Sequence, residues 1–473
     1  MNKIKNIKKL AMRTDMITEN EISIAEDYQL EFLYEKLDNP LKTEKTKDDT
    51  KILNVLSLFS GCGGMDLGFE GDFEVLSSSV NEKLTPHFIN KKRPKGLTLL
   101  AKTRFKTVFA NDILLDARNA WLNYFSKRGN KVQDFHKESI VDLVKMYRNG
   151  VNVFPKNVDV VTGGFPCQDF SIAGKRNGFK SHKNHKGEII ESEETIDNQI
   201  ASVETRGQLY MWMKEVIEIT QPKIFIAENV KGLVNLDNVK EIIRKDFSTA
   251  NGNGYIVLDP QVLHSADYGV PQSRERVIFI GIKKSELNNE SLKELLKSKL
   301  SDEYNPYPKP THSYLAKGED LKPFVQLKDV FKDLEEPEIS DDLSQKNFSK
   351  AKFMGKHCQG QIEVKLSNIA PTIRSEHHGN IEFRRLSKEN GGVMDLELNK
   401  GLKERRLTVR ECALIQTFPP DYEFVIENKN GRKGSYLVSP SQAYKIIGNA
   451  VPPLLAYNLA KRIENIWDLY FKK

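Results

Sequence analysis

Short apolar runs alternate with helix-like patterns along the first half of the chain, and this alternation constrains the fold more than any other feature. Strands that alternate with helices form a mostly parallel sheet with helices on both of its faces. We therefore predict an α/β fold with a doubly wound, mostly parallel sheet between Asn54 and Ile282. The strand-type runs lie at 52–58, 106–110, 158–161, 222–227 and 277–282.

The bulk composition excludes several classes of protein. Of the 473 residues, 39% are hydrophobic and 29% are charged, which is typical of a packed core with a polar surface. No apolar stretch reaches about eighteen residues, so we expect no membrane contact. The four cysteines form no CxxC pair, which argues against a disulfide framework and a cysteine-based zinc site. We expect a cytoplasmic monomer without a metal ion. The formal charge of +7 permits nucleic acid as a partner but does not require it.

Changes in composition divide the chain into segments. Residues 1–49 are polar and highly charged, and we predict an N-terminal extension with little core of its own. The strand–helix alternation predicts one domain over 50–284. The alternation stops over 285–404, where polar residues and a mixed strand and turn pattern predict a smaller, irregular second domain. Helical patterns return after it, and 405–435 is predicted to be a connecting segment.

A thiol follows the third of the apolar runs. The run Val158–Val161 leads through Thr-Gly-Gly-Phe-Pro to Cys167. Pro166 fixes its own φ and restricts the residue before it, so the position of the thiol is stiffly set. Open α/β folds bind ligands at the carboxyl edge of the sheet, where this thiol is expected. Two interpretations stay open from this stretch alone, a reactive nucleophile and a small buried cysteine in a tight turn.

A glycine-rich loop follows the first apolar run. Glycines at 61, 63 and 64 let the backbone approach a ligand closely, and the helix that follows offers free N–H groups. In such folds an acid after the second strand binds a ribose hydroxyl. Glu82 has the usual spacing but polar surroundings, whereas Asp112 ends a clean strand. We therefore choose Asp112 and predict that 77–104 is a surface insertion.

Two further polar clusters adjoin the later strands. Glu228 comes directly after an apolar run, and a carboxyl group at a buried edge can have a raised pKa and act as an acid. A capping or turn-forming glutamate is the alternative. Gln272, Arg274 and Arg276 precede the last strand at alternate positions, so they share one face of an extended segment.

Eight sequence blocks occur in a specific order: FSGCGG, AND, GGFPCQDFS, RGQLY, AENVKGL, DYGVPQSRER, RRLTVRECALIQTFP and SQAYKIIGNAVPP. This order closely resembles the bacterial cytosine-C5 DNA methyltransferases of restriction-modification systems. The resemblance spans 53–462, with gaps at 77–104, at 182–204 and over most of 283–403. It implies the S-adenosylmethionine-dependent methyltransferase fold, with 436–473 completing the first domain. It also implies methyl transfer from S-adenosylmethionine to carbon 5 of a flipped cytosine in a specific duplex DNA sequence, which protects DNA from a cognate restriction endonuclease.

The resemblance assigns roles residue by residue. Cys167 would add to carbon 6 of the base, because a soft thiolate can attack and later be eliminated. Glu228 would protonate or hydrogen-bond N3 of the base. Arg276 would contact the base, and Arg274 would support the loop. The cofactor pocket would comprise Phe59, Gly61, Gly63, Asp112 on the ribose, Ile113 beside the adenine, Pro166, Leu209, Asn449 and Ala450.

Residues 285–404 fall where the family carries its target-recognition domain. Arg374, His377 and Arg384 in this segment, and Gln272 before it, are predicted DNA contacts. One position departs from the family, because Ser139 stands where an aspartate usually contacts the adenine amino group. Either the serine substitutes, or Glu138 or Asp142 takes over through a shifted register, so we leave that contact unassigned.

Two other functions stay open for these blocks. A tRNA cytosine-C5 methyltransferase would use the same blocks, but the long segment 285–404 favours a reader of duplex DNA. A catalytically silent DNA-binding regulator is the other alternative, and the presence of Cys167, Glu228 and Arg276 argues against it.

Overall fold

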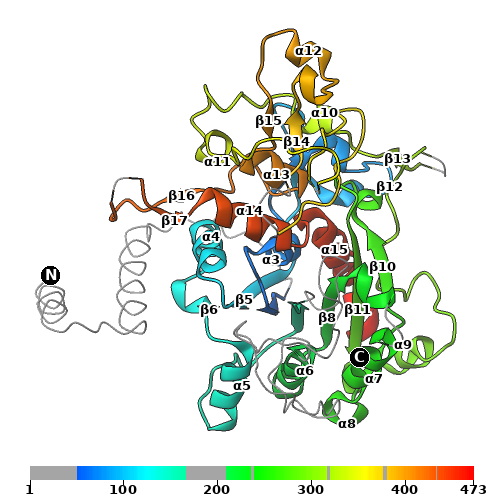
Figure 1. Cartoon of the computed structure of the whole chain (residues 1–473). Coiled ribbons are helices and arrows are strands. Elements are labelled where there is room, and N and C mark those ends of the chain that lie inside the picture. The colour runs from blue at the N-terminus through cyan, green and yellow to red at the C-terminus, as the bar shows by residue number, and fades with distance from the viewer. Residues whose placement is uncertain are drawn as a thin grey trace, which may run out of the picture.

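The structure is a computed structural model of the chain (Figure 1). Three predictions fall outside the residues that it describes: the extension 1–49, the nucleophile Cys167 and the DNA contact His377. The described residues are 51–166, 209–235, 239–316, 320–358, 360–375, 381–432 and 434–472.

An eight-stranded sheet forms the centre of the molecule, in the order β10-β11-β8-β7-β1-β5-β6, with β9 paired to β11. The pairs from β8 to β6 are parallel, whereas β11 runs antiparallel to β8, β9 and β10. The doubly wound, mostly parallel sheet is therefore confirmed. Its strands are β1 (Leu53–Leu58), β5 (Phe105–Asn111), β6 (Phe135–His136), β7 (Val160–Gly164), β8 (Ile224–Val230), β9 (Tyr255–Val257), β10 (Gln261–His264) and β11 (Glu275–Lys283).

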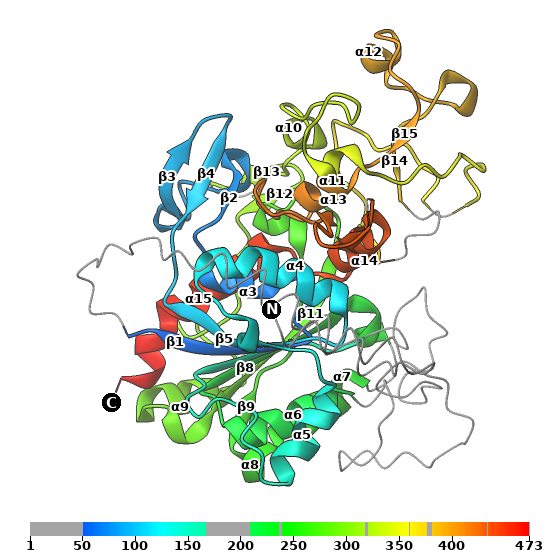
Figure 2. The ribbon, with the colours of Figure 1, turned by 90° about the vertical axis from the view of Figure 1, so that its left-hand side faces the viewer.

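Two apolar cores cover the two faces of this sheet. Successive residues of a strand point to opposite faces, so Leu53 and Val55 join one core while Leu56 and Leu58 join the other. Figure 2 shows α3, α4 and α15 on one face and α5 and α6 on the other. The helices are α3 (Gly64–Glu70), α4 (Leu115–Phe125), α5 (Ile140–Arg148), α6 (Leu209–Thr220), α7 (Val239–Ser248), α8 (Ala250–Asn253) and α15 (Pro453–Phe471).

The last helix lies against the first described helix. A β-carbon at Gly68 of α3 would lie 2.4 Å from the β-carbon of Ala456 and 2.4 Å from the carbonyl oxygen of Pro453. Only a glycine allows this approach, because any side chain would push α15 away. α3 and α15, which are far apart in the sequence, thus build one layer over β1 and β5 (Figure 2).

The insertion 77–104 contributes to a second, small sheet. This three-stranded sheet has the order β2-β4-β3, with antiparallel pairing throughout. The charged strand β3 is mostly exposed, whereas alternate residues of β4 are buried. The strands are β2 (Glu74–Leu76), β3 (Ile89–Arg93) and β4 (Leu97–Leu100).

The region 285–404 consists of short elements joined by loops. Apart from α9, which lies low beside the far end of α15, it lies with α13 above the α3–α4 layer (Figure 1, Figure 2). Its elements are α9 (Asn289–Leu295), β12 (His312–Ser313), β13 (Lys322–Pro323), α10 (Leu327–Val330), α11 (Leu343–Lys346), β14 (Phe383–Arg385) and α12 (Asp395–Leu398). The elements that follow are β15 (Arg405–Arg406), α13 (Val409–Ile415), β16 (Ile426–Glu427), β17 (Tyr436–Val438) and α14 (Pro440–Asn449).

Candidate active site

The glycine-rich loop turns sharply between β1 and α3. Phe59, Gly61 and Gly63 all have positive φ, at 54°, 54° and 77°. A β-carbon at Gly63 would lie 2.7 Å from the Trp121 ring, so this glycine is required by packing against α4. A β-carbon at Gly61 would meet no atom within 4 Å. Gly61 is therefore the position where open space lies beside the backbone.

Asp112 lies next to this loop, at the end of β5. Its carboxylate accepts hydrogen bonds from the N–H groups of Gly61 and Leu114, each at 2.9 Å. Burial raises the pKa of Asp112, whereas these N–H groups and the charge of Lys445 lower it. A carboxylate has about four lone-pair positions, so Asp112 keeps acceptor capacity for a ligand hydroxyl. The neighbouring Ile113 side chain is 47% exposed and is free to contact a ligand.

The carboxyl ends of β7 and β8 lie side by side. Gly164 pairs in register with Glu228, and a β-carbon at Gly164 would lie 2.8 Å from Glu228 Oε2. The amide of Asn229 donates a hydrogen bond to the carbonyl of Phe165 at 3.2 Å. The backbone that leads to Cys167 through Pro166 is therefore held directly beside Glu228.

Glu228 forms an ion pair with Arg276, which lies on the neighbouring strand β11. Arg276 Nε lies 2.6 Å from Glu228 Oε1, and both side chains are largely buried. Burial raises the pKa of Glu228, and the charges of Arg276 and Arg274 oppose this rise. A carboxyl group with a raised pKa is better suited than a free one to give a proton to a bound base. The structure thus brings Glu228 and Arg276 together at the edge of the sheet beside Gly164.

Arg274 lies in the interior, where its guanidinium donates hydrogen bonds to three backbone carbonyls. Its Nη1 donates to Ile373 O at 2.9 Å, and its Nη2 donates to Gly448 O at 2.9 Å and Ala450 O at 2.8 Å. Arg274 therefore ties the loop before β11 to the end of α14 and to the second region. This arrangement agrees with the predicted role of supporting the loop.

The C-terminal block reaches the glycine-rich loop. A β-carbon at Gly64 would lie 2.2 Å from Val451 O and 3.3 Å from the β-carbon of Ala450. Asn449 is exposed at the end of α14, while Ala450 is buried. The edge of the sheet around β1, β5 and β7 thus gathers Gly61, Asp112, Ile113, Pro166, Asn449 and Ala450.

Residues 53–199 and 192–465 match the profile of the family described as C-5 cytosine-specific DNA methylase. The chain belongs to this family. It is 32% identical to the type II methyltransferase M.BsuRI of Bacillus subtilis, over 90% of this chain and 83% of that protein. It is also 32% identical to M.BspRI of Lysinibacillus sphaericus, over 89% and 83%. The solved structure of S. pombe Dnmt2 methyltransferase covers 88% of this chain with a TM-score of 0.50 and 17% identity, with 99% of that chain matched, and shares the fold.

The protein is therefore a DNA cytosine-C5 methyltransferase, and its methyl donor is S-adenosylmethionine. The residues around Gly61 and Asp112 fit this donor, because open space lies beside Gly61 and Asp112 can accept a hydroxyl. Among the described residues no group of three or more His, Cys, Asp or Glu could hold a metal ion. In the same part of the chain no helix is long and apolar enough to cross a membrane.

The structure corrects the predicted DNA contact at Gln272. This side chain is fully buried; its Nε2 donates to Gln416 Oε1 at 3.0 Å, and its Oε1 accepts from Ile373 N at 2.9 Å. Gln416 in turn donates to Ile447 O at 2.8 Å. Gln272 thus joins the loop before β11 to α13 and α14, and cannot reach a DNA groove from this position.

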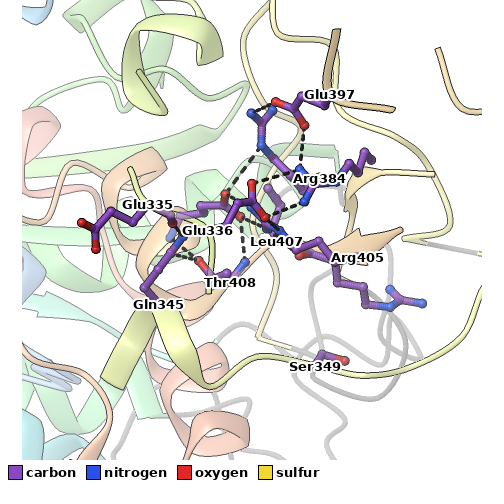
Figure 3. A network of polar contacts seen from close by, with 12 residues as sticks. Glu335, Glu336, Gln345, Ser349, Arg384, Glu397, Arg405, Leu407 and Thr408 are labelled. Atoms are coloured by element: carbon purple, nitrogen blue, oxygen red, sulfur yellow. Dashed lines mark hydrogen bonds and ion pairs between the residues drawn. The ribbon is translucent and has the colours of Figure 1, made fainter. Parts of the chain in front are cut away.

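Arg384 is the second correction, because it belongs to an ionic network in the second region (Figure 3). Its side chain is 8% exposed, forms an ion pair with Glu397 and approaches Glu411 within 3.6 Å. Arg385 and Arg405 both pair with Glu336, at 2.5 and 3.0 Å. Burial among carboxylates keeps Arg384 from DNA.

Three further positions singled out from the sequence are Arg374, Leu209 and Ser139. Arg374 is partly exposed and stays a predicted DNA contact. Leu209 is buried at the start of α6, in the core below the sheet. Ser139 caps α5, because its hydroxyl oxygen accepts a hydrogen bond from Val141 N at 3.3 Å.

One buried acid next to the glycine-rich loop, Asp66, is not among the residues predicted from the sequence. Asp66 of α3 accepts hydrogen bonds from Ser57 Oγ at 2.5 Å and from Trp121 Nε1 at 2.7 Å. Ser57 lies 2.9 Å from Ser60 Oγ, which accepts from Asn111 N. Burial raises the pKa of Asp66 to about 7. An aspartate in the first turn of a helix is usually explained by its favourable interaction with the helix dipole at the surface. The sequence therefore did not indicate that Asp66 is buried or that it bonds Ser57 and Trp121.

Proposed function

We propose that this methyltransferase modifies a flipped cytosine in a specific duplex DNA sequence through a covalent bond between Cys167 and carbon 6. One observation carries the proposal most strongly. The buried Glu228–Arg276 ion pair lies beside the backbone at Gly164, two residues before Pro166 and three before Cys167. A thiol at that position and an acid–base pair at the same edge of the sheet are the groups that this chemistry needs.

Carbon 5 of cytosine is a weak nucleophile, and addition of a thiolate at carbon 6 overcomes this. The Cys167 sulfur forms a bond to carbon 6, and the electron pair of the C5–C6 double bond becomes available at carbon 5. Bound S-adenosylmethionine supplies an electrophilic methyl group. Loss of the carbon 5 proton to a base then restores the double bond and expels the Cys167 thiolate, so the thiol is regenerated.

Glu228 and Arg276 prepare the base for this addition. A proton or hydrogen bond from the Glu228 carboxyl at N3 makes carbon 6 more electrophilic. The raised pKa of Glu228 favours the protonated form that this role needs. Arg276 holds the carboxyl from the neighbouring strand and presents a donor to the base. A base inside a duplex cannot reach this buried pair, which supports base flipping.

The donor site proposed for S-adenosylmethionine surrounds the glycine-rich loop. Asp112 would accept a ribose hydroxyl, because its two backbone hydrogen bonds leave lone pairs free. Ile113 would lie beside the adenine. The other residues of the proposed site are Phe59, Gly61, Gly63, Pro166, Leu209, Asn449 and Ala450.

Residues 285–404 are proposed to read the DNA sequence, with Arg374 and His377 among the contacts. The relatives M.BsuRI and M.BspRI carry the name type II methyltransferase. We infer from them that this chain protects DNA against a cognate restriction endonuclease. We also infer that it acts in the cytoplasm, where bacterial DNA lies, as a monomer.

The nucleophile is tested by replacing Cys167 with alanine. Methyl transfer from labelled S-adenosylmethionine to unmethylated plasmid DNA is expected to fall below detection, because no covalent adduct can form. The wild-type chain should leave 5-methylcytosine at one sequence context in bisulfite sequencing. Full activity of Cys167→Ala would contradict the mechanism, and labelling of tRNA but not of plasmid DNA would contradict the substrate.

A further inference from the structure

The insertion 77–104 joins two parts of the molecule that are far apart in sequence. On one side it is anchored to α15. Tyr457 is fully buried, and its hydroxyl lies 2.9 Å from Ala101 O. The ring of Tyr457 also packs edge-on against Phe73 and Phe88, with ring centroids 5.9 and 5.0 Å apart. The small sheet is thus fixed to α15 through apolar and polar contacts.

On its other side the insertion holds the start of the second region. The Asn81 amide is 1% exposed and donates to Thr311 O at 2.9 Å and to Asp320 O at 2.7 Å. Its Oδ1 accepts from the N–H groups of Lys83 and Leu84, at 3.2 and 3.3 Å. All four hydrogen-bonding positions of this side chain are therefore in use.

A buried histidine adds a second tie. His312 Nε2 lies 3.0 Å from Ser78 O, and His312 Nδ1 lies 2.8 Å from Thr311 Oγ1. A carbonyl oxygen can only accept, so Nε2 carries the proton and Nδ1 accepts from the threonine hydroxyl. Burial lowers the pKa of His312 to about 4, which keeps this neutral form at working pH. Lys322 completes the contact by donating to Val80 O at 2.7 Å.

The same insertion also touches the loop that leads to the catalytic arginines. Gly269 has φ of 82°, and a β-carbon there would lie 2.2 Å from Ser79 O. Thr311 N donates to Asp267 O at 2.8 Å, so loop 265–272 is also hydrogen-bonded to the residue that precedes β12. Arg274 and Arg276 follow this loop within a few residues.

We propose that residues 77–104 form a brace that sets the position of the second region over the loop carrying Arg274 and Arg276. Asn81 of the brace and His312 of the second region are the positioning residues of this contact, and neither touches DNA or cofactor in this role. The proposal rests on the proposed reading of DNA by 285–404. The Asn81 amide and the His312 imidazole are both buried and hydrogen-bonded where the insertion meets the second region. An insertion that only covered the surface would not need buried polar contacts of this kind.

The substitution Asn81→Asp tests the brace in the full chain. It keeps the acceptor for Lys83 and Leu84, but it replaces the donor with an oxygen facing two carbonyls. With unmethylated plasmid DNA and labelled S-adenosylmethionine, we expect the KM for DNA to rise roughly tenfold or more, because both hydrogen bonds that the amide donates are lost. The KM for S-adenosylmethionine should stay unchanged.

Thr98→Val is the matched control. Thr98 is fully buried in β4, and its hydroxyl bonds Ser77 Oγ at 2.7 Å, inside the insertion. A purely structural loss would lower the active fraction and leave both KM values unchanged in either variant. Equal DNA KM for Asn81→Asp and Thr98→Val would overturn the brace. A wild-type chain that leaves plasmid DNA unmethylated would instead overturn the proposed function.

A milder variant covers the case in which Asn81→Asp does not fold. Lys322→Met keeps the apolar stem but loses the bond to Val80 O. We expect its DNA KM to rise about two- to threefold, since one partly exposed bond is lost. Lys95→Met removes one charge at the exposed turn between β3 and β4 and controls for the change in charge. Identical DNA KM for these two lysine variants would overturn the proposal.

Discussion

The catalytic sheet and the region 285–404 differ in how much ion pairing adds to apolar burial. β8 and β11 are seven and nine residues long and are buried by apolar side chains on both faces. β14 and β15 have only three and two residues, and arginine–glutamate pairs hold them. Large apolar side chains of the second region stay exposed, among them Ile339 at 73%, Met354 at 71% and Leu396 at 83%.

This difference predicts a rigid catalytic sheet and a second region whose stability depends on pH. Apolar burial is non-directional and does not titrate, so the ends of β7, β8 and β11 give Glu228 and Arg276 fixed positions. Ion pairs are directional and depend on pH, so the second region loses part of its stability when its carboxylates are protonated. A substitution in the first part should therefore act mainly on rate, and one in the second part mainly on stability.

The largest expected effect is on rate, from Glu228→Gln. Glutamine keeps the shape of the side chain and an acceptor for Arg276, but it has no proton to give to the base. We expect kcat to fall by about 10² to 10⁴, the usual contribution of a general acid. The free energy of unfolding should change by only about 1 kcal/mol, because the neutral amide keeps a hydrogen bond to Arg276 and avoids the cost of burying a charged carboxylate. Single-turnover methylation of plasmid DNA and urea unfolding measure the two quantities.

Glu275→Gln is the matched control on the same strand. Its carboxylate pairs with Lys231 at 2.7 Å on the exposed side, away from the base. Its kcat should stay near that of the wild type. A loss of stability in Glu228→Gln as large as its loss of rate would contradict the prediction that substitutions in the catalytic part act mainly on rate.

The sequence predicted the catalytic half better than the second region for a physical reason. Apolar runs mark strands, and strand ends mark the edge of a parallel sheet, so Asp112 and Glu228 could be placed from local pattern alone. Gln272 and Arg384 were predicted at the DNA because polar residues on loops are usually exposed. Their partners lie far along the chain: Gln416 is 144 residues from Gln272, and local pattern shows no such pairing.

The next effect in size is on stability, from Glu336→Gln. Burial alone would raise the pKa of Glu336, but hydrogen bonds and charges from Arg385 and Arg405 lower it from 4.5 to about 2. Glu397 and Glu411 still pair with the two arginines in the variant. We therefore expect a loss of about 2 kcal/mol in the free energy of unfolding near neutral pH, below the usual cost of breaking a buried pair.

The pH dependence sharpens this prediction. A carboxyl with a depressed folded-state pKa stabilises fully above its unfolded value and loses that contribution as pH falls toward the folded value. The difference in the free energy of unfolding between wild type and Glu336→Gln should therefore decrease by roughly 1 kcal/mol as the pH falls from about 6 to about 4. Glu338→Gln, an exposed neighbour, should show neither effect. A gap independent of pH would mean that the network does not depend on the ionised Glu336.

The smallest effect is expected at Gln416, where the two regions meet. Its amide accepts from Gln272 and donates to Ile447 O, so it touches both the loop before Arg274 and the helix before Asn449. Gln416→Leu fills the same space but leaves two buried polar groups without their partner. We expect about 1 kcal/mol less stability and a fewfold lower kcat together, because neither region alone holds this residue. In a cycle with Gln272→Leu, the double variant should lose less than the sum of the two single losses, since both remove one shared bond. Additive losses would show that the regions are joined elsewhere, and the brace at Asn81 would then be the main link between them.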